Sequence, residues 1–177
     1  MTRAILSIGS NLGDRHQHLR RAVRLLGQSV AAVSGVYETP PWGDADQPAY
    51  LNAVLLAVDP RAAPHDWLAR AHACEAAAGR VRDPARRFGP RTLDVDVIEV
   101  WDTDGRPVLS DDPVLTLPHP RANERAFVLR PWLDIEPAGE LPGRGPLAGL
   151  LTDPALAADL AGMTPRPDLP LESCSEQ

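Results

Sequence analysis

The chain has 177 residues, of which 18 are basic and 24 are acidic, so its formal net charge is −6. All 18 basic residues are arginine, and the lack of lysine excludes functions that need a lysine amine, such as a Walker-type phosphate loop or a Schiff base. The net negative charge disfavours nucleic-acid binding, which uses a basic surface. With 44% hydrophobic and 24% charged residues, the chain is predicted to form one globular domain with a sizeable core.

Cysteine usage and apolar runs set expectations about the compartment. Cys74 and Cys174 lie far apart in the sequence, so we expect no structural disulfide and predict a reducing, cytoplasmic setting. The apolar run near Met1 is too short for a signal peptide, and the longest apolar stretch, residues 53–58, is too short to span a membrane. We expect no membrane or nucleic-acid partner, and we expect a monomer.

The first predicted elements are a strand and a helix. Residues 4–8 are apolar and are followed by a turn signal at residues 9–11. Asp14 is suited to cap a helix whose apolar side chains recur at steps of three and four residues, and Gly27 is suited to end it.

Four further elements follow. Residues 30–39 predict a second strand that stops at two prolines, and residues 50–58 predict a third strand, apolar enough to lie centrally in a sheet. Residues 64–78 begin with proline and precede Gly79, as a helix does. Residues 93–101 predict the fourth strand. The order β-α-β-β-α-β is that of a ferredoxin-like α+β sandwich.

The C-terminal third predicts additions to this sandwich. A proline-rich stretch leads to a short helix near residues 123–132, and the pattern weakens beyond Pro154. Residues 164–177 predict a flexible tail. We therefore expect one domain over residues 1–163, with extra helical and loop elements at its C-terminal end.

The loop at residues 80–91 carries five arginines and one acid, a local net charge of +4. A solvated charged loop is one interpretation. However, the planar fork of arginine suits phosphate oxygens, and this loop leads directly into a pair of acids. The arginines are Arg80, Arg82, Arg86, Arg87 and Arg91.

That pair is Asp94 and Asp96. On a strand, residues i and i+2 point to the same face with Cα atoms about 6.5–7 Å apart, so two carboxylates there can hold one or two Mg²⁺ ions. The spacing Asp-x-Asp occurs three times in the chain, but the other two pairs lie in loop or turn sequence, where aspartate is expected. Only this pair opens a predicted strand, and it is our candidate metal site.

A basic loop beside an acid pair suits phosphoryl transfer, in which arginines spread the phosphate charge and metal ions bridge it. The same residues suit a metal phosphodiesterase or a nucleotidyltransferase, and composition does not choose among them. Other candidates are weaker. His72 and Glu75 share a face of the second helix, and His119 lies between prolines. The remaining candidates are an aromatic slot and an amide inside an apolar strand: Tyr50, Trp42, Phe127 and Asn52.

These motifs together carry a resemblance. Residues 87–98, RFGPRTLDVDVI, resemble the signature of the 6-hydroxymethyl-7,8-dihydropterin pyrophosphokinases, enzymes of the folate pathway. Five further blocks agree with this family in the same order, and the resemblance covers roughly residues 3–145. The blocks are residues 8–13, 37–41, 46–52, 79–82 and 117–119.

The resemblance implies a ferredoxin-like fold and transfer of the β,γ-diphosphate of ATP to the pterin hydroxymethyl oxygen, with release of AMP. It implies that Asp94 and Asp96 hold two Mg²⁺ ions and that Arg82 and Arg91 contact the phosphates during catalysis. The other implied ATP contacts are His72, Glu75, His119 and Arg125. The implied pterin contacts are Thr39, Pro40, Trp42, Tyr50, Asn52 and Phe127.

We expect in-line attack at the β-phosphorus without a covalent enzyme intermediate, with metal binding and positioning supplying most of the acceleration. Two alternatives remain: a Mg²⁺-dependent nucleotide hydrolase or phosphodiesterase, and a non-enzymatic ligand-binding module. A hydrolase would consume ATP without pterin, and a binding module would not need Mg²⁺.

Overall fold

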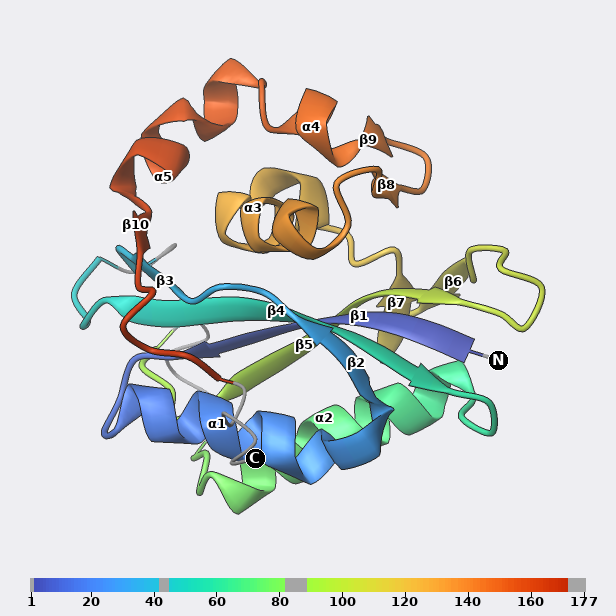
Figure 1. Ribbon diagram of the computed structural model, residues 1–177, viewed down its shortest axis with the longest axis horizontal. Helices are drawn as coiled ribbons and strands as arrows, with labels where there is room; N and C mark the ends of the chain where they lie inside the picture. The colour runs from blue at the N-terminus through green and yellow to red at the C-terminus, as the bar shows by residue number, and fades with distance from the viewer. Residues whose placement is uncertain (1, 42–44, 82–88, 172–177) are drawn as a thin grey trace, which may run out of the picture.

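The computed structural model describes residues 2–41, 45–81 and 89–171. A central antiparallel sheet separates two layers: helices α1 and α2 cover one face, and helix α3 lies on the other (Figure 1). The protein is therefore a mixed α and β fold, as its sequence predicts. Its strand order is β10-β3-β4-β1-β5, with β2 paired beside β3 on β4.

The middle of the sheet is the longest antiparallel pair. Strand β1 (Thr2–Ser10) lies between β4 (Tyr50–Asp59) and β5 (Asp94–Trp101). Both β1 and β4 are nearly continuous in apolar residues because both faces of the sheet are covered. Ser7 of β1 aligns with Asp96 of β5 and Gly9 with Asp94, so the predicted acid pair lies at the start of an edge strand of the sheet.

One predicted strand is two strands in the structure. Instead of residues 30–39, the chain forms β2 (Val30–Val33) and β3 (Tyr37–Thr39), which pair with different parts of β4. Between them, the backbone N–H of Ser34 donates to the Val54 carbonyl, and the Ser34 hydroxyl accepts from the Val54 N–H. This side-chain bond replaces a regular ladder bond, so the strand is interrupted there.

The two helices of the first layer begin and end at the residues that the sequence indicates. Helix α1 (Arg15–Leu26) is capped by Asp14, whose carboxylate accepts from the Gln17 N–H at 3.0 Å. It is followed by the short 3₁₀ helix η1 (Gly27–Ser29). Helix α2 (Pro64–Ala77) starts at its proline. Gly79 beyond it adopts a φ of 68°, a left-handed conformation that favours glycine.

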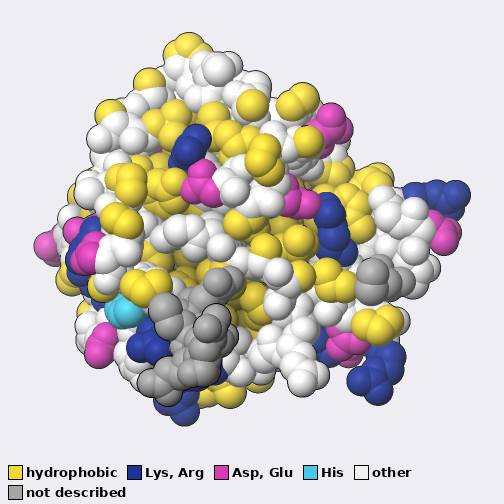
Figure 2. Space-filling model, in the orientation of Figure 1, with side chains coloured by type: hydrophobic (Ala, Val, Ile, Leu, Met, Phe, Trp, Pro, Cys, Tyr) yellow, Lys and Arg dark blue, Asp and Glu magenta, His cyan; other side chains and the backbone are white. Residues whose placement is uncertain are grey.

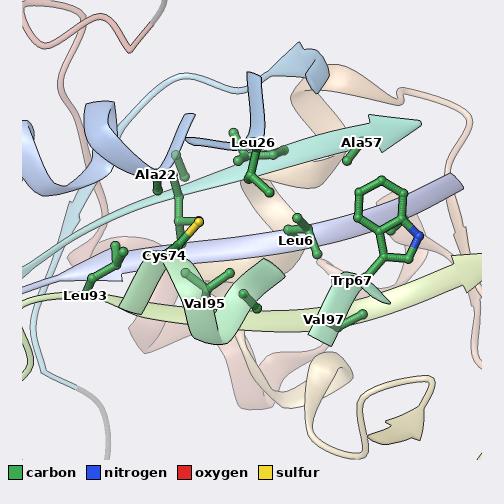
Figure 3. Packing of buried hydrophobic residues seen from close by; sticks show 14 of the residues in the cluster. Leu6, Ala22, Leu26, Ala57, Trp67, Cys74, Leu93, Val95 and Val97 are labelled. Carbon is green, nitrogen blue, oxygen red and sulfur yellow. The ribbon is translucent and has the colours of Figure 1, made fainter. Parts of the chain in front are cut away.

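These helices bury their apolar sides against the sheet. Leu6 and Val97 come from the strands, while Leu26, Trp67 and Cys74 come from the helices (Figure 3). Trp67 is fully buried in this cluster. Because Val95 and Val97 point into this core, the alternation of β5 turns Asp94 and Asp96 to the opposite face.

A second core lies on that opposite face. Helix α3 (Ala126–Ile135) buries Leu129 and Trp132 against the sheet, and Trp132 packs edge-on to Trp101 of β5. The remaining elements are short. They are β6 (Ser110–Asp112), β7 (Leu115–Leu117), η2 (Ala122–Glu124), β8 (Glu140–Leu141), β9 (Gly145–Pro146), α4 (Leu147–Leu150), η3 (Pro154–Leu156) and α5 (Ala157–Gly162).

The segment predicted as a flexible tail differs from that expectation over its first part. Strand β10 (Thr164–Pro165) pairs with β3, and Leu171 is buried in the core below the sheet. The pairing joins residues distant in sequence, so no local pattern announces it. Residues 172–177 of the predicted tail lie outside the described residues.

None of the helices formed by the described residues is long and apolar enough to cross a membrane. On the face shown in Figure 2, basic and acidic side chains are interspersed, and apolar side chains reach the surface between them.

Candidate functional site

Two pockets meet beside the start of β5. One is a small slot bounded by β1, β3, β4 and the start of α3. The other is a groove of about 840 Å³ between α2, β5 and the β6–β7 hairpin, a size typical of ligand sites. The two pockets share four lining residues: Arg91, Asp94, Asp96 and Arg125. Two acids and two arginines therefore form the boundary between the slot and the groove.

Asp94 stands at the first position of β5 and is held by two arginines. Its Oδ1 lies 2.7 Å from Nη1 of Arg80, and its Oδ2 lies 2.8 Å from Nη1 of Arg91. Its side chain is 23% exposed. The carboxylate is thus oriented from both sides while one edge still reaches the groove.

Arg80 connects this acid to helix α2. Its guanidinium, 9% exposed, also pairs with the carboxylate of Glu75, and the Val95 N–H donates to the same carboxylate at 3.0 Å. Glu75 is itself buried. The sequence predicts Glu75 as a nucleotide contact; in the structure its carboxylate fixes Arg80 and the start of β5 at the floor of the groove.

Asp96 pairs with Arg125, the second arginine of the boundary. Its Oδ2 lies 2.7 Å from Nη1 of Arg125, just before α3, and 4.0 Å from Nε2 of His119. Burial lowers the pKa of His119, while Asp96 opposes this and Arg125 adds to it. The Nδ1 of His119 accepts from the Arg121 N–H at 3.2 Å, so the neutral ring carries its proton on Nε2, facing the boundary.

Arg91 is positioned by its backbone as well as by Asp94. Its N–H donates to Oδ1 of Asn11 at 2.7 Å, and the Asn11 N–H donates to the Arg91 carbonyl at 3.1 Å. Burial alone would lower the pKa of Arg91, but the carboxylate of Asp94, with Tyr50 and Asp96, raises it overall. Arg91 therefore remains a cation.

The slot has a polar floor between aromatic side chains. The amide of Asn52, 4% exposed, donates to the hydroxyl of Thr39 at 2.7 Å, which fixes the direction of the amide. Gly9 makes room for it, because a Cβ there would lie 2.9 Å from Oδ1 of Asn52. Tyr50 and Phe127 line the same slot. Such a space suits a flat, polar-edged ring.

The donor set fits a metal bound together with a ligand. Within the described residues, no group of three or more His, Cys, Asp or Glu side chains is arranged to hold a metal ion. Asp94 and Asp96 are two oxygen donors on one face. Mg²⁺ is typically bound by one or two carboxylates, with waters and substrate phosphates completing its shell. The pair fits that mode better than a resident metal centre.

The structure brings most of the predicted site residues together. Asp94, Asp96, Arg91 and Arg125 form the boundary, and His72 and His119 line the groove, with His72 exposed on α2. Thr39, Pro40, Tyr50, Asn52 and Phe127 line the slot. Predicted residues Arg82 and Trp42, with Arg86 and Arg87, lie outside the described residues.

Sequence reasoning missed the positioning roles of Arg80 and Asn11. Arg80 was visible only as one of five loop arginines, and Asn11 only as part of a turn. Their partners, Asp94 and Arg91, are distant in sequence. The only sequence signals were the blocks at residues 8–13 and 79–82, which agree with the family pattern.

Paired carboxylates and arginines between two pockets are typical of enzymes that transfer a phosphate-bearing group. The family model that matches residues 5–137 is described as 7,8-dihydro-6-hydroxymethylpterin-pyrophosphokinase (HPPK), and the chain belongs to this family.

Two named relatives agree with this family assignment. A Mycobacterium bovis protein is 47% identical over 160 residues, covering 86% of this chain and 84% of that protein. A Mycobacterium leprae protein is 51% identical over 146 residues, covering 80% of this chain and 75% of that protein. Both are named 2-amino-4-hydroxy-6-hydroxymethyldihydropteridine pyrophosphokinase.

A solved structure also resembles the fold. It is described as HPPK-DHPS in complex with substrates, and it matches with a TM-score of 0.59 at 10% identity. The match covers 84% of this chain but only 42% of the solved chain. At this identity the likeness concerns the fold alone.

Proposed function

We propose that the chain transfers the β,γ-diphosphate of ATP to the hydroxymethyl oxygen of 6-hydroxymethyl-7,8-dihydropterin, giving AMP and the pterin diphosphate for folate biosynthesis. Membership of the HPPK family supports this activity. The structural observation that carries it is the boundary between slot and groove, where Asp94 and Asp96 face both pockets. A group transferred between two ligands has to cross such a boundary.

The groove is the proposed ATP site. Arg91 and Arg125 face it from the boundary as cations suited to phosphate oxygens, and Nε2–H of His119 is available as a neutral donor. His72 lies at the groove wall. We assign Glu75 an indirect part, because its buried carboxylate holds Arg80. Arg82 is proposed from the family pattern alone.

The slot is the proposed pterin site. Its aromatic walls suit stacking between Tyr50 and Phe127, while Asn52, oriented by Thr39, is suited to the polar edge of the ring. Pro40 lies at the rim. Trp42, also predicted to contact the pterin, lies outside the described residues and is proposed from the family pattern alone.

We propose that Asp94 and Asp96 hold two Mg²⁺ ions when ATP is bound. Bound there, Mg²⁺ would neutralise phosphate charge and orient the transferred group. Arg91 and Arg125 lie beside these carboxylates and would face the phosphate oxygens of a nucleotide bound in the groove.

The proposed reaction is one in-line displacement. The hydroxymethyl oxygen bonds to the β-phosphorus as the bond from that phosphorus to the α,β-bridging oxygen breaks; AMP leaves with this oxygen, and the hydroxyl proton is released to solvent water. Nδ1 of His119 already accepts from the Arg121 N–H, so the nitrogen that faces the boundary carries a proton and has no lone pair for a general base. The site accelerates the step chiefly by alignment and charge stabilisation.

Three finer points belong to the proposal. The sheet order β3-β4-β1-β5, with α1 and α2 on one face, supports a ferredoxin-like topology. A monomeric state and a cytoplasmic location rest on the sequence expectations alone.

The deciding experiment measures AMP formation from Mg-ATP with and without the pterin. We expect AMP only when both are present. A nucleotide hydrolase would consume ATP without pterin, and a binding module would release nothing. Asp96→Asn should reduce kcat by about 100-fold or more, because a charged metal ligand is lost. Asp104→Asn, from the Asp-x-Asp pair at the hairpin turn, is the matched control and should be active.

A further inference from the structure

The C-terminal segment at residues 162–171, which we call the strap, passes around the open edge of the sheet. It leaves α5 on the α3 side, crosses β3 and ends beside α1 on the other side (Figure 1). Strand β10 pairs with Glu38 and Tyr37 of β3, and the Arg166 N–H donates to the Val36 carbonyl at 2.8 Å. The strap therefore covers the strand that carries Thr39 to the slot.

The strap is fixed at its far end as well. The Pro170 carbonyl lies 2.8 Å from Nε2 of His16 on α1, and Leu169 and Leu171 pack into the core between α1 and the sheet. The family match ends at residue 137, so the strap lies wholly beyond it.

A chain of polar contacts links the strap to the wall of the slot. Nη1 of Arg166 lies 3.3 Å from Oε2 of Glu38, and Nη2 of Arg15 lies 2.8 Å from the same oxygen. Nη1 of Arg15 donates to the Ala49 carbonyl at 2.9 Å. Ala49 immediately precedes Tyr50, one of the two aromatic walls. All three charged side chains are about 30% exposed, so the contacts are partly shielded from solvent.

The strap also touches the rim of the slot directly. A Cβ added at Gly162 would lie 3.2 Å from Cγ and 3.3 Å from Cδ of Pro40. Glycine therefore lets the end of α5 pack closely against the slot-lining proline.

We propose that the strap is a positioning element of the acceptor slot and that Arg166 is its positioning residue, acting through Glu38 and Arg15 on the backbone before Tyr50. This inference rests on the proposed function for the identity of the acceptor. The strap contacts the slot wall and rim, whereas Arg166 lines neither pocket. Its loss should therefore weaken pterin binding and leave ATP binding unchanged.

The first test compares Arg166→Ala with Arg106→Ala. Both arginines pair with an aspartate two residues away, but Arg106 lies on the hairpin after β5, away from the slot. For Arg166→Ala we expect the KM for pterin to rise about three- to tenfold, with the KM for ATP and kcat within about twofold of wild type. Arg166→Lys keeps a cation beside Glu38, so its KM for pterin should be close to that of wild type. Arg106→Ala should match wild type.

The second test uses the glycine contact. Gly162→Ala should push Pro40 and raise the KM for pterin, whereas Gly149→Ala, where a Cβ meets nothing within 4 Å, should not. Calorimetric pterin binding, measured with thermal unfolding of each variant, separates a slot effect from general destabilisation.

An unchanged pterin KM in both Arg166→Ala and Gly162→Ala would overturn the inference, and so would equal rises in the two KM values. Failure of the proposed function is distinguishable, because then the wild-type protein itself would form no AMP with pterin and Mg-ATP.

Discussion

At the residue scale, one buried acid lies outside the site. Glu99 on β5 is fully buried; its Oε1 accepts from the Val100 N–H at 3.1 Å, while its Oε2 has no hydrogen-bond partner among the residues that the structure describes. Burial raises its pKa to about 7 from 4.5. The native state therefore binds this proton more tightly than the unfolded chain does.

This acid predicts a pH dependence of stability. The stabilising contribution of the protonated Glu99 carboxyl to the free energy of unfolding is fully present below about pH 4.5. It is lost as the pH rises through about 7, because the carboxyl must then ionise inside the core. Between pH 5 and pH 8, wild type should lose about 2.5 kcal/mol more unfolding free energy than Glu99→Gln. Urea unfolding at both pH values measures this. Equal losses of unfolding free energy in wild type and Glu99→Gln would contradict this prediction. Glu140→Gln, at an exposed position, is the control and should behave like wild type.

A second residue-scale prediction concerns Gly9. Alanine there would place its Cβ 2.9 Å from Oδ1 of Asn52, so the amide must leave its bond to Thr39. Gly9→Ala should raise the Kd for pterin on the order of tenfold, because a buried amide then lacks its partner, and it should leave nucleotide affinity unchanged. Titration with each ligand measures this. Gly35→Ala, where a Cβ meets nothing within 4 Å, is the control; equal pterin affinity in both variants would refute the steric argument.

At the scale of elements, Arg80 ties helix α2 to strand β5. Glu75 and Arg80 are 6% and 9% exposed, and Arg80 also orients Asp94. Arg80→Met should lower the free energy of unfolding by about 3 kcal/mol, because the buried Glu75 carboxylate loses its ion pair with Arg80. Adding Glu75→Gln should recover much of this stability but not the turnover, since Asp94 then has only one of its two arginine partners. Denaturant unfolding and AMP release separate the two effects.

The control for Arg80 is an arginine of helix α2 itself. Arg70 pairs with Asp59 at 2.6 Å, but this pair is more exposed, at 34% and 17%. Arg70→Met should therefore destabilise the protein less, and it should leave turnover intact. Equal losses of turnover in the two variants would contradict the positioning role of Arg80.

Elements also differ in how far sequence could predict them. The helices followed from local signals at their ends, such as the Asp14 cap and Gly79. The interruption at Ser34 and the pairing of β10 with β3 could not be predicted, because both depend on partners distant in the chain. The same holds within the site: Asp94 and Asp96 were visible from spacing, whereas the contact of Asn11 with Arg91 joins residues 80 positions apart.

At the scale of the whole molecule, the two faces of the sheet have different roles. The α1–α2 side supplies the larger core, the slot lies on the α3 side, and the groove runs along β5 between α2 and the β6–β7 hairpin. The residues of the boundary line both pockets, so a ligand in one pocket would contact side chains that also form the wall of the other.

This shared boundary predicts reciprocal coupling between the two ligands. A magnesium complex of a non-hydrolysable ATP analogue should draw Asp94 and Asp96 to metal and direct Arg91 and Arg125 to phosphate, completing the inner wall of the slot. Pterin affinity should then increase about five- to 150-fold, the usual range of coupling, and the analogue should bind more tightly by the same factor when pterin is present. Calorimetric titration in both orders measures the two factors. Independent binding would show that the pockets do not communicate through the four shared side chains, and Asp96→Asn should reduce the coupling in both directions.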